Sequence, residues 1–557
     1  MLIYSSDLCD QTVADVRVCI VGAGAAGITL ACELDGCGHK VLLLEAGGLK
    51  PTAATQDYYV GAANPPHPRS SEWRRVVFGG TTSVWGGRCV PFDPIDFEPR
   101  EYVTNSGWPI SYAEIARYYP RAMQYCEAGE FDFTATGSID RGVPTIAGWT
   151  SDGVIDNDLI ERYSPPTRFG KKYRAALRAS RNVTAILGTR CTGLCRAAGD
   201  DRIEGVQVVL QSGKRRVIHA DIVILAMGGI ETARILLASD RNGSGFGNRM
   251  DLVGRFYGCH LGCVVGKFVP QRGKAAFDFE KTRDGIYCRR KFQFTAAAQR
   301  ENRLLNTAFR LHFPAYSDAS HKSSVMSTIY LAKSMLIPEY RNIIEYNAEH
   351  LAVKSPARQH WRNVVMGVPQ VIRFGIDWTF RIHLARREMP YNLVESQNGS
   401  YPLEFNCEQT PMESSRIMLL SDRDKHAIPR VRIDWRRSDE DIVSAHRGFV
   451  VLREALSRTG VCRLEFDDSK LHERLASAAP VWSHHLGTTR MAMSPRNGVV
   501  DTNCAIFDLP DVYVASSAVF PTGSHANPTL TIVALSLRMA AHLRGRLNAP
   551  IPTAALG

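Results

Sequence analysis

The chain has 557 residues, 45% apolar and 22% charged, a composition typical of a soluble protein of roughly three to four domain-sized units. The N-terminal segment has no basic region followed by an apolar run, and no apolar stretch of about 18 residues occurs. We therefore expect a cytoplasmic protein that does not span a membrane. The fourteen cysteines are scattered without a metal-binding spacing, so neither a disulfide framework nor a metal site is predicted. The formal charge of +11 comes without a long run of like charges, which gives nucleic-acid binding little support.

The first predicted unit is a strand, a glycine turn, a helix and a second strand. Gly22, Gly24 and Gly27 follow the first strand, and Glu45 ends the second. In this spacing the first glycine makes the tight turn, the second lets a pyrophosphate approach the backbone, and the third permits close helix–sheet packing. The acidic side chain can accept hydrogen bonds from an adenosine ribose. The segment therefore predicts a dinucleotide site with its phosphate at a helix N-terminus.

Further strands follow this unit. An apolar strand at 221–226 runs into Gly228 and a predicted helix, as a buried parallel strand would. The segments 182–187 and 205–210 alternate and are divided by turn residues, which predicts a small antiparallel insertion. The cofactor domain is therefore expected to be discontinuous. Residues 256–479 carry no cofactor motif and are assigned to substrate binding by elimination.

Residues 331–390 carry an ambiguous apolar pattern, with nine Lys/Arg against five Asp/Glu. Apolar residues alternate with mostly polar ones from Ile372 to Leu384, which favours a strand. Every fourth residue from Ile372 also fits one helix face, so periodicity does not decide between the two. We expect core packing beneath the substrate sheet. The alternative hypothesis is peripheral contact with a membrane or a lipid-linked substrate.

Four blocks of sequence together resemble the glucose-methanol-choline (GMC) family of flavin oxidoreductases. They are the glycine turn with Glu45, the segment FGGTTSVWGG at 78–87, the segment WSHHLGTTRM at 482–491, and the segment from VASSAVFP to NPTLTI at 514–532. The amino-acid sequences of the last two blocks are most similar to the pyranose-oxidase-like, sugar-oxidising branch.

The resemblance implies an α/β fold in two parts. One is a discontinuous, Rossmann-like FAD-binding domain, which we place at residues 1–100, 175–255 and 480–557. The other is an α+β substrate-binding domain built on an antiparallel sheet, at residues 256–479. Residues 101–174 would connect the two and cover the flavin.

The resemblance also implies two catalytic residues. His484 holds the position of the family's active-site histidine, and Asn527 that of the second active-site residue. A neutral histidine is suited to removing an alcohol proton near neutral pH, so His484 is predicted to be the base. Asn527 would hold the substrate oxygen in register while hydride passes to flavin N5. His485 is interpreted as a non-catalytic neighbour, and His260 and His525 as hydrogen-bonded structural residues.

Most of the expected FAD contacts come from backbone and small side chains. By resemblance they are Gly22, Gly24, Ala26, Gly27, Glu45, Ala46, Gly79, Gly80, Thr81, Thr82, Ser83, Trp85, Cys191, Gly228, Ser516, Ser517, Pro528 and Thr529. Val84 stands where some sugar oxidases carry a histidine linked to the flavin, so noncovalent FAD is expected. Ser516 replaces a common acidic residue, which weakens the prediction of its flavin contact.

The predicted function is FAD-dependent oxidation of an alcohol, a hydroxyl of a sugar or glycoside, to a carbonyl. The electron acceptor stays open among oxygen, a quinone and a carrier protein, with a modest preference for a dehydrogenase. The alternative is a flavin-containing lyase of the same fold, because fold does not fix chemistry. A scaffold would not need His484 together with Asn527, and the flavin-type blocks argue against a nicotinamide enzyme.

Overall fold

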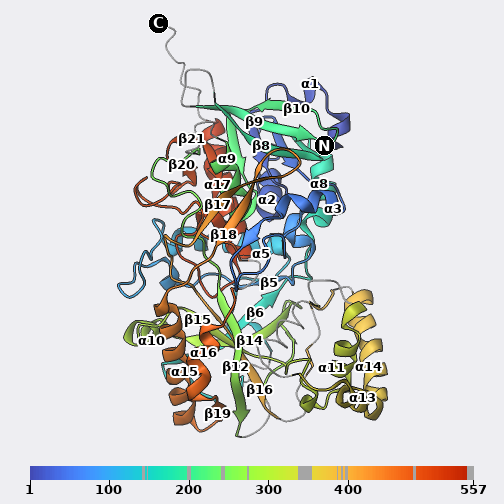
Figure 1. Ribbon diagram of the computed structural model, residues 1–557, viewed down its shortest axis with the longest axis vertical. Coiled ribbons are helices and arrows are strands. Elements are labelled where there is room, and N and C mark those ends of the chain that lie inside the picture. The colour runs from blue at the N-terminus through green and yellow to red at the C-terminus, as the bar shows by residue number, and fades with distance from the viewer. Residues whose placement is uncertain are drawn as a thin grey trace.

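The computed structural model describes residues 1–140, 145–146, 148–196, 202–239, 245–271, 275–335, 341, 354–385, 387–390, 393–394, 399–480 and 484–548. Two large sheets organise the molecule (Figure 1), one mainly parallel and one antiparallel. Residues 482 and 483 of the predicted block 482–491 lie outside the described residues, as does most of 336–353.

The first sheet carries the glycine turn. Its strand order is β1-β7-β3-β2-β11-β21-β20, and all neighbours pair in parallel except β20 with β21. The strands are β1 (Leu2–Tyr4), β2 (Val18–Val21), β3 (Val41–Glu45), β7 (Val183–Leu187), β11 (Ile222–Leu225), β20 (Ala505–Ile506) and β21 (Leu509–Val514). The residues of β2, β3, β7 and β11 are all buried, as expected for parallel strands that are covered on both faces. This confirms the predicted Rossmann-like architecture.

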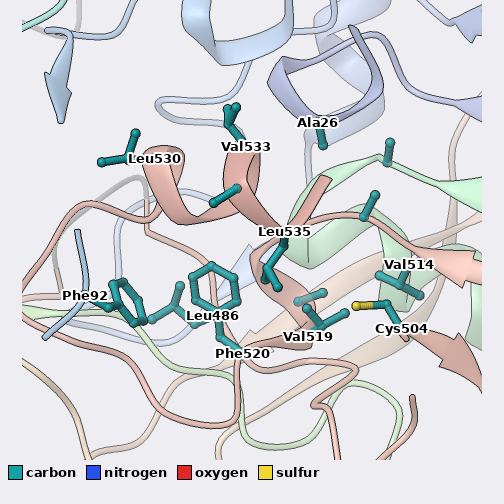
Figure 2. Close-up of a cluster of buried hydrophobic side chains, with 14 of the residues drawn as sticks. Ala26, Phe92, Leu486, Cys504, Val514, Val519, Phe520, Leu530, Val533 and Leu535 are labelled. Carbon is teal, nitrogen blue, oxygen red and sulfur yellow. The ribbon is translucent and has the colours of Figure 1, made fainter. Parts of the chain in front are cut away.

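The helices α2 (Ala25–Glu33), α9 (Gly228–Ala238) and α17 (Pro528–Asn548) belong to this half, and α17 packs against α2 and α5 (Tyr119–Cys126). Leu535 of α17 lies in a buried cluster with side chains from distant parts of the chain (Figure 2): Phe92, Leu486, Val514, Val519 and Phe520. Each fully buried apolar side chain of this size contributes about 1.5–3 kcal/mol. The C-terminal helix is therefore integral to the cofactor half.

The second sheet is antiparallel throughout, as predicted for the substrate domain. Its order is β19-β12-β16-β15-β14-β6-β5, and β13 pairs with β14. The strands are β5 (Arg88–Cys89), β6 (Ile155–Tyr163), β12 (Leu261–Pro270), β13 (Glu280–Lys281), β14 (Tyr287–Phe294), β15 (Thr307–Leu311), β16 (Tyr401–Cys407) and β19 (Cys462–Glu465). Because β5 and β6 precede residue 256, this sheet takes in chain from outside 256–479; the proposed domain boundaries stay a prediction.

Two three-stranded sheets complete the β-structure. One has the order β10-β9-β8 and the other β17-β18-β4. Their strands are β8 (Thr189–Arg196), β9 (Ile203–Leu210) and β10 (Arg215–His219), and β4 (Ala62–Ala63), β17 (Arg416–Arg423) and β18 (Pro429–Asp434). The predicted antiparallel insertion exists, but its assignment of 182–187 was wrong. That segment forms β7 inside the parallel sheet, because its short apolar run is buried on both faces.

Further helices, short and long, and turns connect these sheets. They are η1 (Ser5–Asp7), α1 (Asp10–Val13), α3 (Ala53–Gln56), η2 (Asp57–Tyr59), η3 (Gly80–Ser83), η4 (Pro94–Phe97), α4 (Tyr112–Ala116), α6 (Ala135–Ser138), α7 (Phe169–Lys172), α8 (Arg174–Ala179), α10 (Ala296–Glu301), η5 (Ala319–His321), α11 (Ser324–Leu331), η6 (Lys333–Met335), α15 (Asp439–Thr459), α16 (Asp468–Ala476) and η8 (Ser517–Val519). Among the described residues, no helix is both long and apolar enough to cross a bilayer.

The ambiguous segment within 331–390 is helical where the structure describes it. It forms α13 (Ala357–Met366), α14 (Val368–Trp378) and the π-helical turn η7 (Thr379–Leu384). The strand interpretation was therefore wrong. The expectation of core packing was also wrong, because the apolar residues at every fourth position from Ile372 to Leu384 are exposed. Alternation and four-residue spacing coincide over this stretch, which is why the sequence pattern could not separate them.

Candidate active site

A cavity of about 520 Å³ lies where the glycine turn, the glycine-rich segment and the C-terminal blocks meet. Both predicted catalytic residues line it, and so do fifteen of the eighteen predicted cofactor-binding residues: Gly22, Gly24, Ala26, Glu45, Ala46, Gly80, Thr81, Thr82, Trp85, Cys191, Gly228, Ser516, Ser517, Pro528 and Thr529. The fold therefore brings together residues as far apart in sequence as Gly22 and Thr529, 529 − 22 = 507 positions.

The other three predicted residues, Gly27, Gly79 and Ser83, do not line the cavity. A Cβ atom on Gly27 would lie 1.9 Å from the carbonyl oxygen of Gly22, so this glycine lets α2 pack against the turn. Gly79 has a φ of +102°, and a Cβ atom there would lie 2.6 Å from the backbone nitrogen of Gly170. Both glycines shape the loops around the cavity.

Three helix N-termini meet at the cavity. Gly24 precedes α2, Gly228 begins α9 and Pro528 begins α17, and all three residues line the space. The unpaired N–H groups of a helix N-terminus favour negative charge. A Cβ atom on Gly24 or Gly228 would meet nothing within 4 Å, so the backbone there faces open space. This arrangement fits the pyrophosphate of a dinucleotide.

The carboxylate of Glu45 is held at one side of the cavity. Its Oε2 accepts from the backbone nitrogen of Ala23 at 3.0 Å, and its Oε1 accepts from that of Gly47 at 2.8 Å. Burial raises the pKa of this carboxyl to about 7, and the backbone donors oppose the shift. An acidic acceptor next to the turn is the group that the sequence pattern assigned to an adenosine ribose. The residues present therefore fit FAD.

The side chains of His484 and Asn527 both line the cavity and contact each other. Nε2 of His484 lies 3.0 Å from Nδ2 of Asn527, and Nε of Arg88 donates to Oδ1 of Asn527 at 2.5 Å. Because Arg88 binds the carbonyl oxygen of the amide, the NH2 group must face the histidine. Nε2 of His484 is therefore an acceptor and carries no proton.

The second ring nitrogen of His484 is bonded to another histidine. Its Nδ1 lies 2.7 Å from Nδ1 of His260, so a proton on His484 Nδ1 is donated to His260. Burial lowers the pKa of His484 well below its usual value, and His260, Arg88 and His485 add to this effect. Burial also lowers the pKa of His260 to about 3. The pair is neutral at neutral pH, so Nε2 of His484 presents a lone pair, and the lowered pKa makes the ring a weaker base than a histidine in water.

Arg88 is itself positioned by the antiparallel sheet. It lies on β5, and its Nη1 is 3.7 Å from Oε1 of Glu161 on β6. Nη1 of Arg310 donates to the same carboxylate at 2.7 Å, and the hydroxyl of Tyr163 donates to it at 3.0 Å. Sequence reasoning missed Arg88, although it is the first charged residue after the glycine-rich segment. His260 was expected to be structural, and the sequence gave no sign of its contact with His484.

His485 is directed into a different group of side chains. Its Nδ1 lies 2.7 Å from the hydroxyl of Tyr257, which also lies 2.8 Å from Nε2 of His67. Cys259 is close to the same hydroxyl, so the phenol links the three potential metal ligands by hydrogen bonds. His525 lies in a further buried cluster, where its Nε2 is 3.2 Å from Nζ of Lys291.

Comparison with known proteins is consistent with this geometry. Residues 411–536 match the family model described as GMC oxidoreductase. The chain is 24% identical to 2-methyl-1,2-propanediol dehydrogenase of Mycolicibacterium austroafricanum, over 97% of this chain and 96% of the relative. It is 25% identical to paromamine 6'-oxidase of Streptomyces fradiae, over 97% and 92% of the two chains. It is also 22% identical to the fructose dehydrogenase large subunit of Gluconobacter japonicus, over 94% and 96%.

Among solved structures, the fold is similar to that of pyridoxine 4-oxidase from Mesorbium loti, with a TM-score of 0.53 and 15% identity. The alignment covers 95% of this chain and 99% of that structure. The relatives named above are oxidases and dehydrogenases that align along nearly their whole length. Residues 411–536 therefore carry the GMC oxidoreductase C-terminal domain, and the chain is similar along nearly its whole length to oxidases and dehydrogenases that act on alcohol groups, members of an FAD-binding family.

Proposed function

We propose that the protein oxidises a hydroxyl group of a sugar or glycoside to a carbonyl, with His484 as the base, Asn527 as its partner and FAD bound noncovalently. The observation that carries this proposal is the pairing of a neutral histidine acceptor with an oriented amide donor at a shared cavity. FAD, when bound, supplies the acceptor for the hydride that leaves the alcohol carbon.

In this proposal the alcohol oxygen binds between the two side chains. Nε2 of His484 takes the O–H proton, while an N–H of Asn527 donates to the oxygen as negative charge develops on it. The imidazolium that forms still donates from Nδ1 to His260, which stabilises the protonated ring. Arg88 keeps the amide from rotating, so the donor stays directed at the oxygen. The roles are thus divided between proton removal and positioning.

The carbohydrate substrate class rests on two lines of support. The segments at 482–491 and 514–532 resemble the sugar-oxidising branch, and one relative is named as a fructose dehydrogenase large subunit. The formal charge of +11 leaves room for a phosphorylated or nucleotide-linked sugar. Noncovalent FAD is supported by Val84, which lines the cavity and has no nucleophilic atom to bond a flavin. The relatives give the lyase alternative no support.

The test is an anaerobic absorbance titration of the purified protein with free sugars, glycosides, sugar phosphates and simple alcohols. We expect one carbohydrate class to bleach the oxidised flavin band, and the His484→Gln variant to stay yellow with the same compound. Bleaching by simple alcohols alone would refute the carbohydrate assignment. A flavin that stays oxidised with every compound while a substrate is cleaved would refute alcohol oxidation.

A further inference from the structure

The apolar residues that solvent reaches are concentrated on one part of the molecule. Of the seventeen exposed large hydrophobic side chains among the described residues, ten lie between positions 335 and 384. They are Met335, Trp361, Val365, Met366, Val368, Ile372, Ile376, Trp378, Phe380 and Leu384. Scattered single apolar residues are ordinary on a protein surface, but a contiguous group of this kind marks an interaction site.

Helix geometry collects these residues on one face. Ile372, Ile376, Phe380 and Leu384 are spaced by four and are 58%, 55%, 59% and 66% exposed. Residues four apart lie above one another on a helix, so they form a continuous apolar ridge along α14 and η7. No residue of α14 is buried, although α14 packs against α11 on its other side. The ridge therefore faces away from the molecule.

The helices α11, α13 and α14 project together at the side of the half that holds the antiparallel sheet (Figure 1). We call the exposed side of residues 357–384 the α13–α14 surface. Trp361 of α13 is 58% exposed and adds an aromatic side chain to it. Tryptophan, phenylalanine and leucine are typical of the helix faces that insert at the boundary between lipid headgroups and acyl chains.

Exposed basic residues accompany this apolar ridge along the same helical segment. Residues 354–384 contain five Lys/Arg, namely Lys354, Arg358, Arg362, Arg373 and Arg381, and a single acidic residue, Asp377. The five basic residues are exposed, and Asp377 is paired with Arg381 at 2.8 Å. A surface that combines exposed apolar side chains with an excess of basic ones is complementary to an anionic lipid bilayer.

We propose that the α13–α14 surface docks the protein on a bilayer that contains anionic lipids. The helices lie in the headgroup region and do not cross the membrane, because an eleven-residue helix extends about 16 Å against a hydrocarbon core of about 30 Å. The apolar ridge supplies insertion and the arginines supply attraction to the headgroups. This inference stands independently of the substrate class proposed above.

The test is co-sedimentation of the full-length holoenzyme with phosphatidylcholine vesicles, with and without phosphatidylserine. We expect binding to the anionic vesicles and at least about tenfold weaker binding when salt screens the charges. The triple variant Ile372→Ser, Ile376→Ser, Phe380→Ser should lose most of this binding, as should Arg362→Glu combined with Arg373→Glu. The matched control is Val217→Ser, Met250→Ser, Met493→Ser, which removes three exposed apolar residues elsewhere and should bind as the wild type does.

Fluorescence quenching by brominated lipids shows which tryptophan side chains enter the bilayer. Brominated lipids should quench tryptophan fluorescence of the wild type, and Trp361→Phe combined with Trp378→Phe should remove most of that quenching. Wild-type protein that does not bind anionic vesicles, or a ridge variant that binds as well as the wild type, would overturn the proposal. Light scattering provides the remaining outcome: a dimer that the ridge variant abolishes, without vesicle binding, would assign the surface to a second copy of the chain.

Discussion

Arg88 donates from Nε to Oδ1 of Asn527 at 2.5 Å, across 439 positions of sequence. Without this bond the amide could rotate and present its oxygen to His484, and two acceptors would then face each other. The arginine is fixed in turn by the carboxylate of Glu161 in the antiparallel sheet. A strand of the substrate half thus sets the orientation of an amide in the cofactor half.

This relationship predicts that Arg88→Met lowers kcat by about ten- to a hundredfold, because a misplaced donor loses its alignment with the developing charge. The thermal midpoint of unfolding should stay close to that of the wild type, because Glu161 keeps Arg310 and Tyr163 as partners. Steady-state kinetics of Arg88→Met and of the exposed-arginine control Arg283→Met test the prediction. A wild-type kcat in Arg88→Met would contradict it.

His484→Gln should lower kcat by about a hundred- to ten-thousandfold, the usual contribution of a general base, while the flavin spectrum of the purified protein is unchanged. His260→Gln acts through His484 and should have a smaller effect. Single-turnover reduction of the flavin in a stopped-flow instrument separates these rates from product release. Equal loss in the two variants would argue against His484 as the proton acceptor.

Two glycines of one motif should respond differently to the same substitution. Gly24→Ala places a Cβ in open space, so the cofactor-free protein should keep its stability but bind FAD more weakly. Gly27→Ala places a Cβ 1.9 Å from a backbone oxygen, so it should destabilise or prevent folding. FAD titration by fluorescence and urea unfolding of the cofactor-free protein distinguish the two effects. Equal losses of stability would refute the assigned difference.

Stability should fall as the pH drops from about 6.5 to about 4. In the unfolded chain histidines protonate near pH 6.5, whereas burial lowers the pKa values of ten in the folded protein. The largest shifts take His67, His321 and His525 to about 4, His260 to about 3, and His484 and His485 well below normal. Their stabilising contribution is complete above pH 6.5 and is lost as the pH falls, by roughly 1–2 kcal/mol at about pH 5 for each histidine whose pKa burial lowers most.

Burial acts in the opposite sense on three carboxyl groups. It raises the pKa of Asp96 well above its usual value, that of Glu45 to about 7 and that of Asp441 to about 6, so their contribution is present at low pH and is lost as the pH rises through the raised pKa values. Ten histidines outweigh three carboxyls, so the histidines set the net slope of stability against pH. Urea midpoints at about pH 7.5 and about pH 5 measure it, and a higher midpoint in acid would contradict the prediction.

Acid precipitation should release all the flavin into the supernatant, because Val84 has no atom that bonds covalently to it. The absorbance of supernatant and pellet gives the answer directly. A yellow pellet that survives washing would show a covalent link to another residue and would overturn the noncovalent assignment.

The sequence predicted the residues of the site that act within one local unit, but it did not predict the contacts between distant segments. The glycine turn and Glu45 act within one strand–helix–strand unit, so their spacing alone indicates their role. Arg88 and His260 touch the predicted catalytic pair only because distant strands meet, and no spacing records that. Helix α14 and the turn η7 were ambiguous because residues four apart in an alternating strand also share a helix face.

Strand β21, inserted next to β11, and helix α17, packed on α2, both come from the last 49 residues of the chain. A polypeptide still emerging from the ribosome at residue 480 would therefore have its glycine turn but neither His484 nor Asn527. We expect a nascent chain to hold an unfinished sheet with one open edge until β21 has been made. Cofactor loading would then follow synthesis of α17, and chains truncated before α17 would be recognised by chaperones and proteases as incomplete.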